Sequence, residues 1–370
     1  MKVLITGGAG FIGSHTADLL LEKGYEVRIL DSLEPPVHPQ KRKPDYLCAD
    51  VEFILGDVRN KSDVQEALQG IDYVFHLAAY QGYLTDFSKF AFTNDASTAL
   101  IYEVILENAL PVGKVVLASS QAVYGEGRYH CARNGTQYPP PRPLEQLERG
   151  DWELRCPVCQ QPMEPLPTNE SRVSPHNQYA VSKYCQELYA LTLGRRFGIP
   201  TVVLRYSITQ GPRQSFYNAY SGILRISATR LLQNLPPILY EDGKQLRDYV
   251  YVKDVAAANI LAMESKAATY QTYNIGGSEV LSVREYVKLL SKVVGREIIP
   301  EIPGEFRFGD VRHIVSDISK IRELGWQPRT SLEQIISEYL EWAMEQPEVG
   351  DFYTEASQVM KRMGVIRAAR

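Results

Sequence analysis

Short apolar and β-branched runs alternate with segments of helical spacing along the first 210 residues of the chain. The runs that predict strands are Lys2–Thr6, Glu26–Leu30, Glu52–Leu55, Tyr73–Leu77, Lys114–Ser119 and Thr201–Arg205. The segments that predict helices between them are Gly13–Lys23, Ser62–Leu68, Asn94–Asn108 and Tyr179–Phe197. Strands and helices that alternate at this spacing predict an α/β fold built on a doubly wound parallel sheet.

Two parts of the chain depart from this alternation. After about Gly211 the pattern becomes a looser mix that ends in a predicted helix near Ser331–Met344. We expect this part to form a smaller C-terminal lobe at the carboxyl edge of the sheet, where such folds bind ligands. Residues 126–169 contain the proline-rich run Tyr138–Pro143, many charges and three of the five cysteines. Because a plain loop of this length is improbable in a compact domain, we interpret it as an insertion.

Composition narrows the class of protein. The 370 residues are 44% hydrophobic, which is enough for a sizeable core. Forty basic residues against 44 acidic ones give a net charge of −4, which argues against nucleic acid or an anionic membrane as the main partner. No apolar run approaches the roughly 20 residues that span a bilayer, and the first residues do not resemble a secretory leader. The five cysteines are too few for a disulfide framework, so we expect a cytoplasmic location.

Glycines between the first strand and the first helix predict a dinucleotide site. Gly7, Gly10 and Gly13 allow the backbone to approach a pyrophosphate at the start of a helix. Asp31 closes the second strand, where its carboxylate can accept from a ribose hydroxyl and would repel a 2′-phosphate, which favours NAD over NADP. Asp57 ends the next strand, where an adenine amino group is in reach, although a helix cap or turn is the alternative role.

A second motif predicts acid–base chemistry. Tyr179 and Lys183 lie one helical turn apart. The pKa of a free tyrosine is about 10, and lowering it to neutrality requires roughly 4 kcal/mol, which two nearby cations, the lysine and an oxidised nicotinamide, could supply. Ser120 follows an apolar strand and can donate to the oxygen that is oxidised, although serine at a strand end is more often a turn residue.

Taken together, these residues carry a family resemblance. The chain resembles the extended short-chain dehydrogenase/reductase family and, within it, the nucleotide-sugar epimerases and dehydratases. The segments that carry the resemblance are Gly7–Gly13, Asp31, Gly56–Val58, His76–Ala79, Asn94, Ser119–Gly125, Tyr179–Lys183, Leu204–Tyr206, Gly211–Pro212, Arg247–Val255, Tyr273–Gly277 and Gly309–Arg312.

The resemblance implies a Rossmann domain over residues 1–210 that retains NAD. It also implies a substrate-binding lobe, mainly residues 211–370, with some segments returning to the Rossmann domain. The implied cofactor contacts are Gly7, Gly10, Phe11, Ile12, Gly13, Asp31, Asp57, Val58, Leu77, Ala78, Ala79, Asn94, Tyr179, Lys183 and Tyr206. The implied substrate contacts are Gln81, Ser120, Gln121, Asn218, Arg247 and Arg312, the two arginines binding a nucleoside diphosphate, since guanidinium groups pair well with phosphate.

The resemblance also indicates the reaction. In similar enzymes, the residue matching Tyr179 removes a proton from a sugar hydroxyl, usually at C4, while hydride passes to NAD. Dehydratases place an Asp-Glu pair after the residue matching Ser120, but this chain has Gln121 and Ala122, which cannot act as acid or base. Oxidation followed by re-reduction remains, which predicts a nucleotide-sugar 4-epimerase. The alternatives are a 4-ketoreductase or dehydrogenase that releases its cofactor, and a catalytically silent NAD-binding protein.

Among these enzymes the chain looks most like dTDP-L-rhamnose 4-epimerases and UDP-glucose 4-epimerases. The insertion and the run Pro236–Gly243 carry this likeness. Two features depart from it: Ile208 replaces an amide that often meets substrate, and Tyr80–Tyr83 replaces a run of small residues. The resemblance further implies a homodimer through the helices predicted at Asn94–Asn108 and Tyr179–Phe197.

Three cysteines of the insertion form a candidate zinc site. Cys156 and Cys159 have the spacing of a zinc knuckle, and Cys131 lies upstream. Asn134 stands where similar insertions have histidine, which leaves His130 as a candidate fourth ligand. The alternative is three reduced thiols in a loop without metal. A nucleic-acid-binding knuckle is disfavoured by the surrounding acidic residues.

Overall fold

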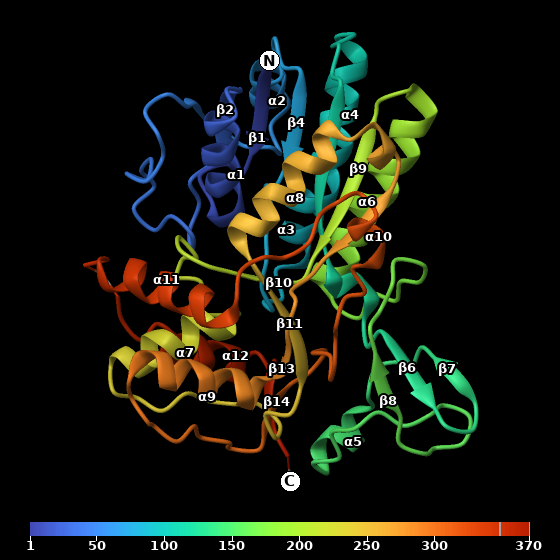
Figure 1. The fold of residues 1–370 in the computed structure, drawn as a ribbon, viewed down its shortest axis with the longest axis vertical. Coiled ribbons are helices and arrows are strands. Elements are labelled where there is room, and N and C mark those ends of the chain that lie inside the picture. The colour runs from blue at the N-terminus through green and yellow to red at the C-terminus, as the bar shows by residue number, and fades with distance from the viewer. Residues whose placement is uncertain (348, 370) are drawn as a thin grey trace.

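The computed structural model describes residues 1–347 and 349–369 (Figure 1). Within them, seven parallel strands form the main sheet in the order β12-β9-β5-β4-β1-β2-β3. These strands are β1 (Lys2–Thr6), β2 (Glu26–Asp31), β3 (Glu52–Leu55), β4 (Tyr73–His76), β5 (Lys114–Ser120), β9 (Thr201–Tyr206) and β12 (Thr272–Ile275). The predicted doubly wound parallel sheet is confirmed.

Helices cover both faces of this sheet. One face packs against α1 (Phe11–Glu22), α8 (Val252–Glu264) and α10 (Ser319–Arg322). The other packs against α2 (Lys61–Ala67), α4 (Ser97–Glu107) and α6 (Gln178–Phe197). The short helix α3 (Phe87–Phe90) continues through a π-helical turn at Ala91–Ala96 into α4. The strands carry apolar side chains on both faces, so both faces of the sheet need to be covered by helices. One apolar cluster forms on each side of the sheet.

A smaller lobe lies at the carboxyl ends of the strands (Figure 1). Its sheet contains β10 (Ile208–Gln210), β11 (Leu246–Tyr251) and β13 (Val280–Ser282). Its helices are α7 (Ile223–Leu232), α9 (Val283–Val294) and α11 (Leu332–Met344), which bury their apolar sides in one cluster. A short helical turn, Lys266–Ala268, follows α8. Ser282 and Glu285 form a capping box that fixes the start of α9, and Gly295 ends it in the left-handed region.

The last segment of the described chain packs back on this lobe. Helix α12 (Tyr353–Arg362) leads to β15 (Ile366–Ala368), which pairs with β14 (Glu305–Arg307). The apolar side of α12 covers a cluster that includes Ile226 of α7. The pairing therefore fixes the strand that carries Arg307.

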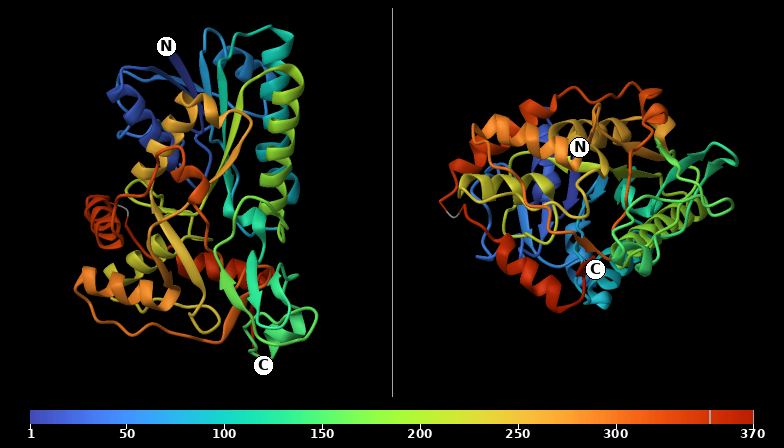
Figure 2. Two further views of the ribbon diagram at one scale, coloured as in Figure 1. Left: turned by 45° about the vertical axis from the view of Figure 1, so that its right-hand side comes forward. Right: turned by 90° about the horizontal axis from the view of Figure 1, so that it is seen from below.

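The insertion folds as a separate small unit at the lower end of the molecule, visible from two sides in Figures 1 and 2. It follows a helical turn at Gln121–Tyr124. Three strands, β6 (Arg128–Cys131), β7 (Gly135–Gln137) and β8 (Glu164–Leu166), form its sheet, with helix α5 (Leu144–Glu148) beside them. Its small apolar cluster includes two cysteines, Cys131 and Cys156.

Most predicted elements are found within two residues of their expected ends. The structure adds β12 to the edge of the main sheet and α8 to one of its faces, although both come from the second half of the chain. The predicted helix at Asn94–Asn108 begins as a π-helical turn. Among the described residues, none of the helices combines the length and the apolar character that crossing a bilayer requires.

Candidate active site

The turn between β1 and α1 packs too closely for side chains. A Cβ on Gly7, whose φ is +70°, would lie 2.7 Å from the backbone of Ala78. A Cβ on Gly13 would lie 2.3 Å from the carbonyl oxygen of Gly7. Helix α1 begins at Phe11, and its first residues line a cavity that no side chain of the glycine turn fills. Since the first N–H groups of a helix have no partner within the helix, a helix start of this kind suits a pyrophosphate.

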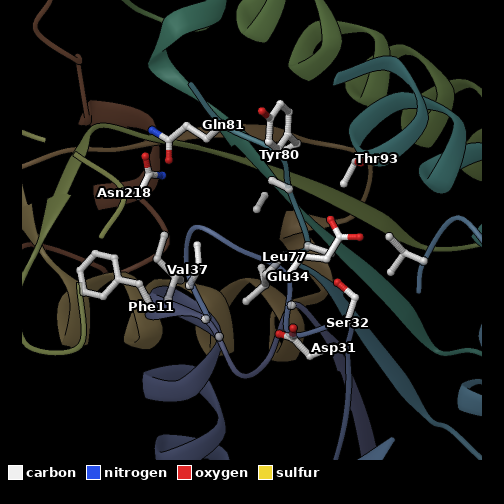
Figure 3. Close-up of a pocket in the computed structure, with 18 of the residues that line it drawn as sticks. Phe11, Asp31, Ser32, Glu34, Val37, Leu77, Tyr80, Gln81, Thr93 and Asn218 are labelled. Atoms are coloured by element: carbon white, nitrogen blue, oxygen red, sulfur yellow. The ribbon is translucent and has the colours of Figure 1, made fainter. Parts of the chain in front are cut away.

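Acidic residues lie at one end of the same cavity (Figure 3). Asp31 accepts hydrogen bonds from the backbone N–H groups of Ala9 at 3.0 Å and Leu33 at 2.9 Å. Burial raises the pKa of this carboxyl group. The two bonds hold its oxygens next to the glycine turn, where a ribose hydroxyl could donate to them. Asp57 instead binds the guanidinium of Arg59.

This cavity has a volume of about 280 Å³. It is lined by Gly7, Gly10, Phe11, Ile12, Gly13, Asp31, Asp57, Val58, Leu77, Ala78, Ala79, Tyr179, Lys183 and Tyr206. Asn94 is the one expected cofactor contact that is missing from this lining, and its side chain is buried. The Asn94 amide accepts from the N–H of Tyr80 at 2.7 Å and donates to its carbonyl at 2.9 Å. These bonds give Asn94 a role in supporting the Tyr80 backbone, and its contact with the cofactor stays a prediction.

Helix α6 and strand β5 bring the acid–base residues together. The Asn177 side chain caps α6 by accepting from the N–H of Ala180 at 2.9 Å, so Tyr179 lies in the first turn. Lys183 follows one turn later, and its Nζ donates to the carbonyl oxygen of Ala118 on β5 at 2.8 Å. Ser120 ends β5 and forms a hydrogen bond with Tyr179.

Burial controls the pKa values of this pair. Burial raises the pKa of Tyr179 to about 12, and the hydrogen bond with Ser120 opposes this only in part. Burial also lowers the pKa of Lys183 to about 7, against the favourable charge of Glu187. The expected shift of the phenol toward neutrality is therefore not produced by these side chains alone. It requires the further positive charge of an oxidised nicotinamide.

A second cavity of about 370 Å³ adjoins the first and shares Gln81, Tyr179 and Tyr206 with it. Ser120, Gln121 and Arg247 also line it. Gln81 and Asn218 come from different lobes and both reach into the cofactor cavity (Figure 3). The Asn218 Oδ1 is buried and has no hydrogen-bond partner in the described structure, so it is open to a ligand.

Arg312, expected to contact substrate, does not line either cavity. Its guanidinium is fully buried and binds Glu153, Glu241 and Asp242. A phosphate cannot reach it, because these carboxylates occupy its donors. The prediction of a direct contact is therefore corrected.

The structure instead places Arg307 in the second cavity. Its guanidinium lies over the rings of Tyr83 and Tyr240, with centroids at 5.1 Å and 4.6 Å, and its buried Nε has no partner in the described structure. Asp310 lines the same cavity. Sequence reasoning missed both. The available signal was an arginine in a short strand just before the turn at Gly309.

The three cysteines of the insertion come together. The sulfur atoms of Cys131, Cys156 and Cys159 lie within 4.8 Å of one another. The Asn134 amide lies 3.6 Å and 3.4 Å from the sulfurs of Cys131 and Cys156. His130 is exposed, because neighbouring residues of strand β6 point to opposite faces, so its expected role as a fourth ligand is wrong.

Comparison with known proteins agrees with this geometry. Fold and site together define an enzyme that binds a dinucleotide and a second ligand in adjoining cavities. The chain matches the NAD dependent epimerase/dehydratase family over residues 3–146 and 157–276, and it belongs to this family.

Two curated relatives align along nearly the whole chain. A dTDP-L-rhamnose 4-epimerase of Burkholderia thailandensis is 32% identical over 351 residues, covering 92% of this chain and 94% of the relative. A putative UDP-glucose 4-epimerase of Methanocaldococcus jannaschii is 31% identical over 347 residues, covering 92% and 97%.

Solved structures share the fold. UDP-glucose 4-epimerase of Thermotoga maritima with UDP-glucose has a TM-score of 0.74 at 29% identity, covering 93% of this chain and 99% of that one. UDP-glucuronic acid 4-epimerase of Bacillus cereus in complex with NAD has a TM-score of 0.73 at 26% identity, covering 92% and 98%. NAD is therefore the cofactor of this site, in agreement with the prediction from Asp31.

Proposed function

We propose that this protein is an NAD-dependent nucleotide-sugar 4-epimerase. The observation that carries the proposal is the position of Tyr179, which lines both the cofactor cavity and the adjoining cavity. Its hydroxyl can therefore meet a sugar hydroxyl on one side while a nicotinamide lies on the other. The named activities of the relatives support this function.

The acid–base step follows from three side chains. Tyr179 takes the proton of the C4 hydroxyl, and Ser120 donates a hydrogen bond to the same oxygen. Bound NAD supplies the hydride acceptor and a positive charge. Lys183, held by Ala118, adds its own charge when protonated and stabilises the phenolate. Since Gln121 and Ala122 offer no acid or base, no group is present there to remove water from C5 and C6.

Inversion requires the 4-keto sugar to turn while its diphosphate stays bound. Arg247 and Arg307 are the cationic groups we assign to the diphosphate, and the amides of Gln81 and Asn218 are the neutral polar groups we assign beside it. Strong charge-assisted bonds at one end and few at the sugar would permit this rotation. Ala122 and Ile208, which line the cavity close to Gln121 and Ser207 in the chain, have side chains that bind no hydroxyl.

The proposal is tested by adding dTDP-L-rhamnose or UDP-glucose to the purified protein without added cofactor and following C4 by proton NMR. Inversion of either sugar supports the 4-epimerase. Steady consumption of added NADH with a 4-keto sugar, in the absence of inversion, would instead support the 4-ketoreductase.

We also propose a homodimer through α4 and α6, which run side by side (Figure 2). Helix α6 exposes Val181, Leu188 and Tyr189, which are 47%, 50% and 44% exposed. An exposed apolar row on α6, beside α4, suits a symmetric interface with a second copy. Light scattering should give a dimer for the wild type and a monomer for Leu188→Lys.

We further propose that the three cysteines of the insertion hold a structural zinc ion. Three clustered sulfurs fit the thiolate preference of zinc, and the Asn134 side chain stands at the remaining side. Cysteines that bind zinc must stay reduced, which fits a reducing cytoplasm as the setting. Metal analysis should find one zinc ion per chain in the wild type and none in Cys156→Ser.

A further inference from the structure

A buried ionic network joins the insertion to the cavity-lining segment of the C-terminal lobe. Its centre is Arg312, whose side chain is 0% exposed. Nη1 donates to Glu241 at 2.9 Å and Asp242 at 2.7 Å, both from the C-terminal lobe. Nε and Nη2 donate to the Glu153 carboxylate of the insertion at 3.1 Å and 2.5 Å. Arg312 therefore ties the two units together.

Glu153 also reaches a second residue of this segment. Its Oε2 lies 3.2 Å from Nε2 of His313, while Nδ1 of the same ring accepts from the N–H of Leu246 at 3.0 Å. Leu246 begins β11 and directly precedes Arg247. The Glu153 carboxylate thus contacts both Arg312 and His313, the two residues that hold the start of β11 in place.

The network ends at a cavity-lining guanidinium. Arg247 donates from Nη1 to the carbonyl oxygen of Arg312 at 2.8 Å and from Nη2 to that of Val311 at 2.7 Å. These two bonds fix the plane of its guanidinium in the second cavity. Because the carbonyls belong to the segment that Glu153 anchors, a shift of that segment would move Arg247.

A second arginine of the insertion supports the same segment. Arg142 is buried and donates to the carbonyl oxygen of Asp310 at 3.1 Å, while it pairs with Glu126 and Glu241. Trp152 of the insertion packs near the ring of Phe306, with centroids 5.9 Å apart. The insertion therefore contacts the segment on both sides of Arg307.

We propose that Glu153 is a positioning residue for substrate binding, which acts through Arg312 and His313 to orient Arg247 toward the substrate diphosphate. This inference rests on the proposed function. It assigns the insertion a role in substrate affinity, although the acid–base residues lie on α6 and β5. A misplaced guanidinium weakens a charge-assisted contact without changing Tyr179 or Lys183, so the effect should fall on binding.

The test uses Glu153→Gln in the full chain with UDP and dTDP as binding probes, measured by calorimetry. We expect the Kd of the better-binding probe to rise about tenfold, because the half-exposed Glu153 carboxylate loses its charge opposite the buried Arg312 guanidinium. With a turned-over nucleotide sugar, KM should rise by a similar factor while kcat stays within about twofold. Glu164→Gln, an exposed carboxylate on β8 of the same insertion, is the matched control and should bind like the wild type.

A double-mutant cycle separates positioning from a general loss of structure. In an Arg247→Ala background, Glu153→Gln should produce no further loss of affinity, since the residue through which it acts is gone. An equal loss in both backgrounds would overturn the proposal, as would an unchanged Kd in Glu153→Gln.

A second variant covers the case in which Glu153→Gln fails to fold. His313→Gln removes the imidazole link between Glu153 and Leu246 but leaves the Arg312 ion pairs, and it should raise Kd about threefold. An unchanged Kd in this variant would contradict the proposal. If the wild type binds neither probe, the proposed function fails and the diphosphate role of Glu153 fails with it.

Discussion

Lys183 donates a hydrogen bond of 2.8 Å from its Nζ to the carbonyl oxygen of Ala118. This bond joins helix α6 to strand β5 two residues before Ser120. Ser120 on β5 and the pair Tyr179 and Lys183 on α6 are therefore held on two rigid elements rather than on loops. This arrangement favours a fixed geometry among the three side chains. The parallel pairing of β5 with β4 and β9 keeps the strand in the middle of the sheet.

Replacing Tyr179 by Phe should remove the general base without disturbing the fold. The ring fills the same space, and only the hydroxyl is lost. We expect kcat to fall by at least about 10³-fold, within the range for removal of an acid–base group, while NAD content stays at the wild-type level. Single-turnover assays and absorbance of the released cofactor check both values. Loss of NAD together with activity would contradict a purely chemical role.

The low pKa of Lys183 predicts how stability changes with pH in protein stripped of NAD. Burial lowers this pKa to about 7 in the folded state, whereas an unfolded lysine keeps a pKa of about 10.4. Between these values the unfolded chain binds more protons, so the stability of the wild type rises with pH across this window. Lys183→Met lacks this dependence. Its Tm should exceed that of the wild type near pH 6.5, and the difference should shrink as the pH approaches 10. A constant difference would argue against a buried, neutral lysine.

Arg307 should contribute more to nucleotide binding than arginines outside the cavity. Its Nε is buried without a partner in the described structure, and the guanidinium faces the second cavity. Arg307→Leu is expected to raise the Kd for UDP or dTDP by about 100-fold, corresponding to a lost charge-assisted contact of roughly 3 kcal/mol. Arg322→Leu, on the exposed side of α10, serves as the control. Equal affinities of the two variants for UDP or dTDP would show that Arg307 does not bind the nucleotide.

Gly13→Ala should prevent the glycine turn from closing. The added Cβ would lie 2.3 Å from the Gly7 carbonyl oxygen and 2.7 Å from Gly8 Cα, and both are backbone atoms that cannot rotate away. Displacement of the turn would misalign the start of α1 and weaken pyrophosphate binding. We expect purified Gly13→Ala to carry less than a tenth of the wild-type NAD, measured after acid release. Full NAD content in this variant would show that the turn adapts.

Local patterns predicted the main sheet because each strand is an apolar run bounded by turns. Strand β12 was not predicted in this way, because its place beside β9 depends on a connection that passes through the C-terminal lobe. Its Asn274 side chain donates to the carbonyl oxygens of Thr168 and Asp317, which lie far away in the sequence. Periodicity carries no information about such long-range pairings.

The two errors among the basic residues have a similar cause. Arg307 and Arg312 lie five residues apart in a segment that turns between two environments. One faces the cavity, and the other faces the carboxylates of Glu153, Glu241 and Asp242, which come from distant parts of the chain. Sequence indicated a phosphate-binding segment but not which arginine faces the ligand. His130 was misjudged for a simpler reason, because its exposure follows from the alternation of β6 once that strand is recognised.

The most direct test of the central claim follows the hydrogen at C4. A nucleotide sugar carrying deuterium at C4, dTDP-L-rhamnose or UDP-glucose, is incubated with the purified protein and its retained NAD in the presence of excess unlabelled NADH. If Tyr179 and the bound cofactor oxidise and re-reduce the sugar in one turnover, the C4-inverted product keeps its deuterium. Product that has lost deuterium to the added NADH pool, or reduction without inversion, would contradict the proposed 4-epimerase.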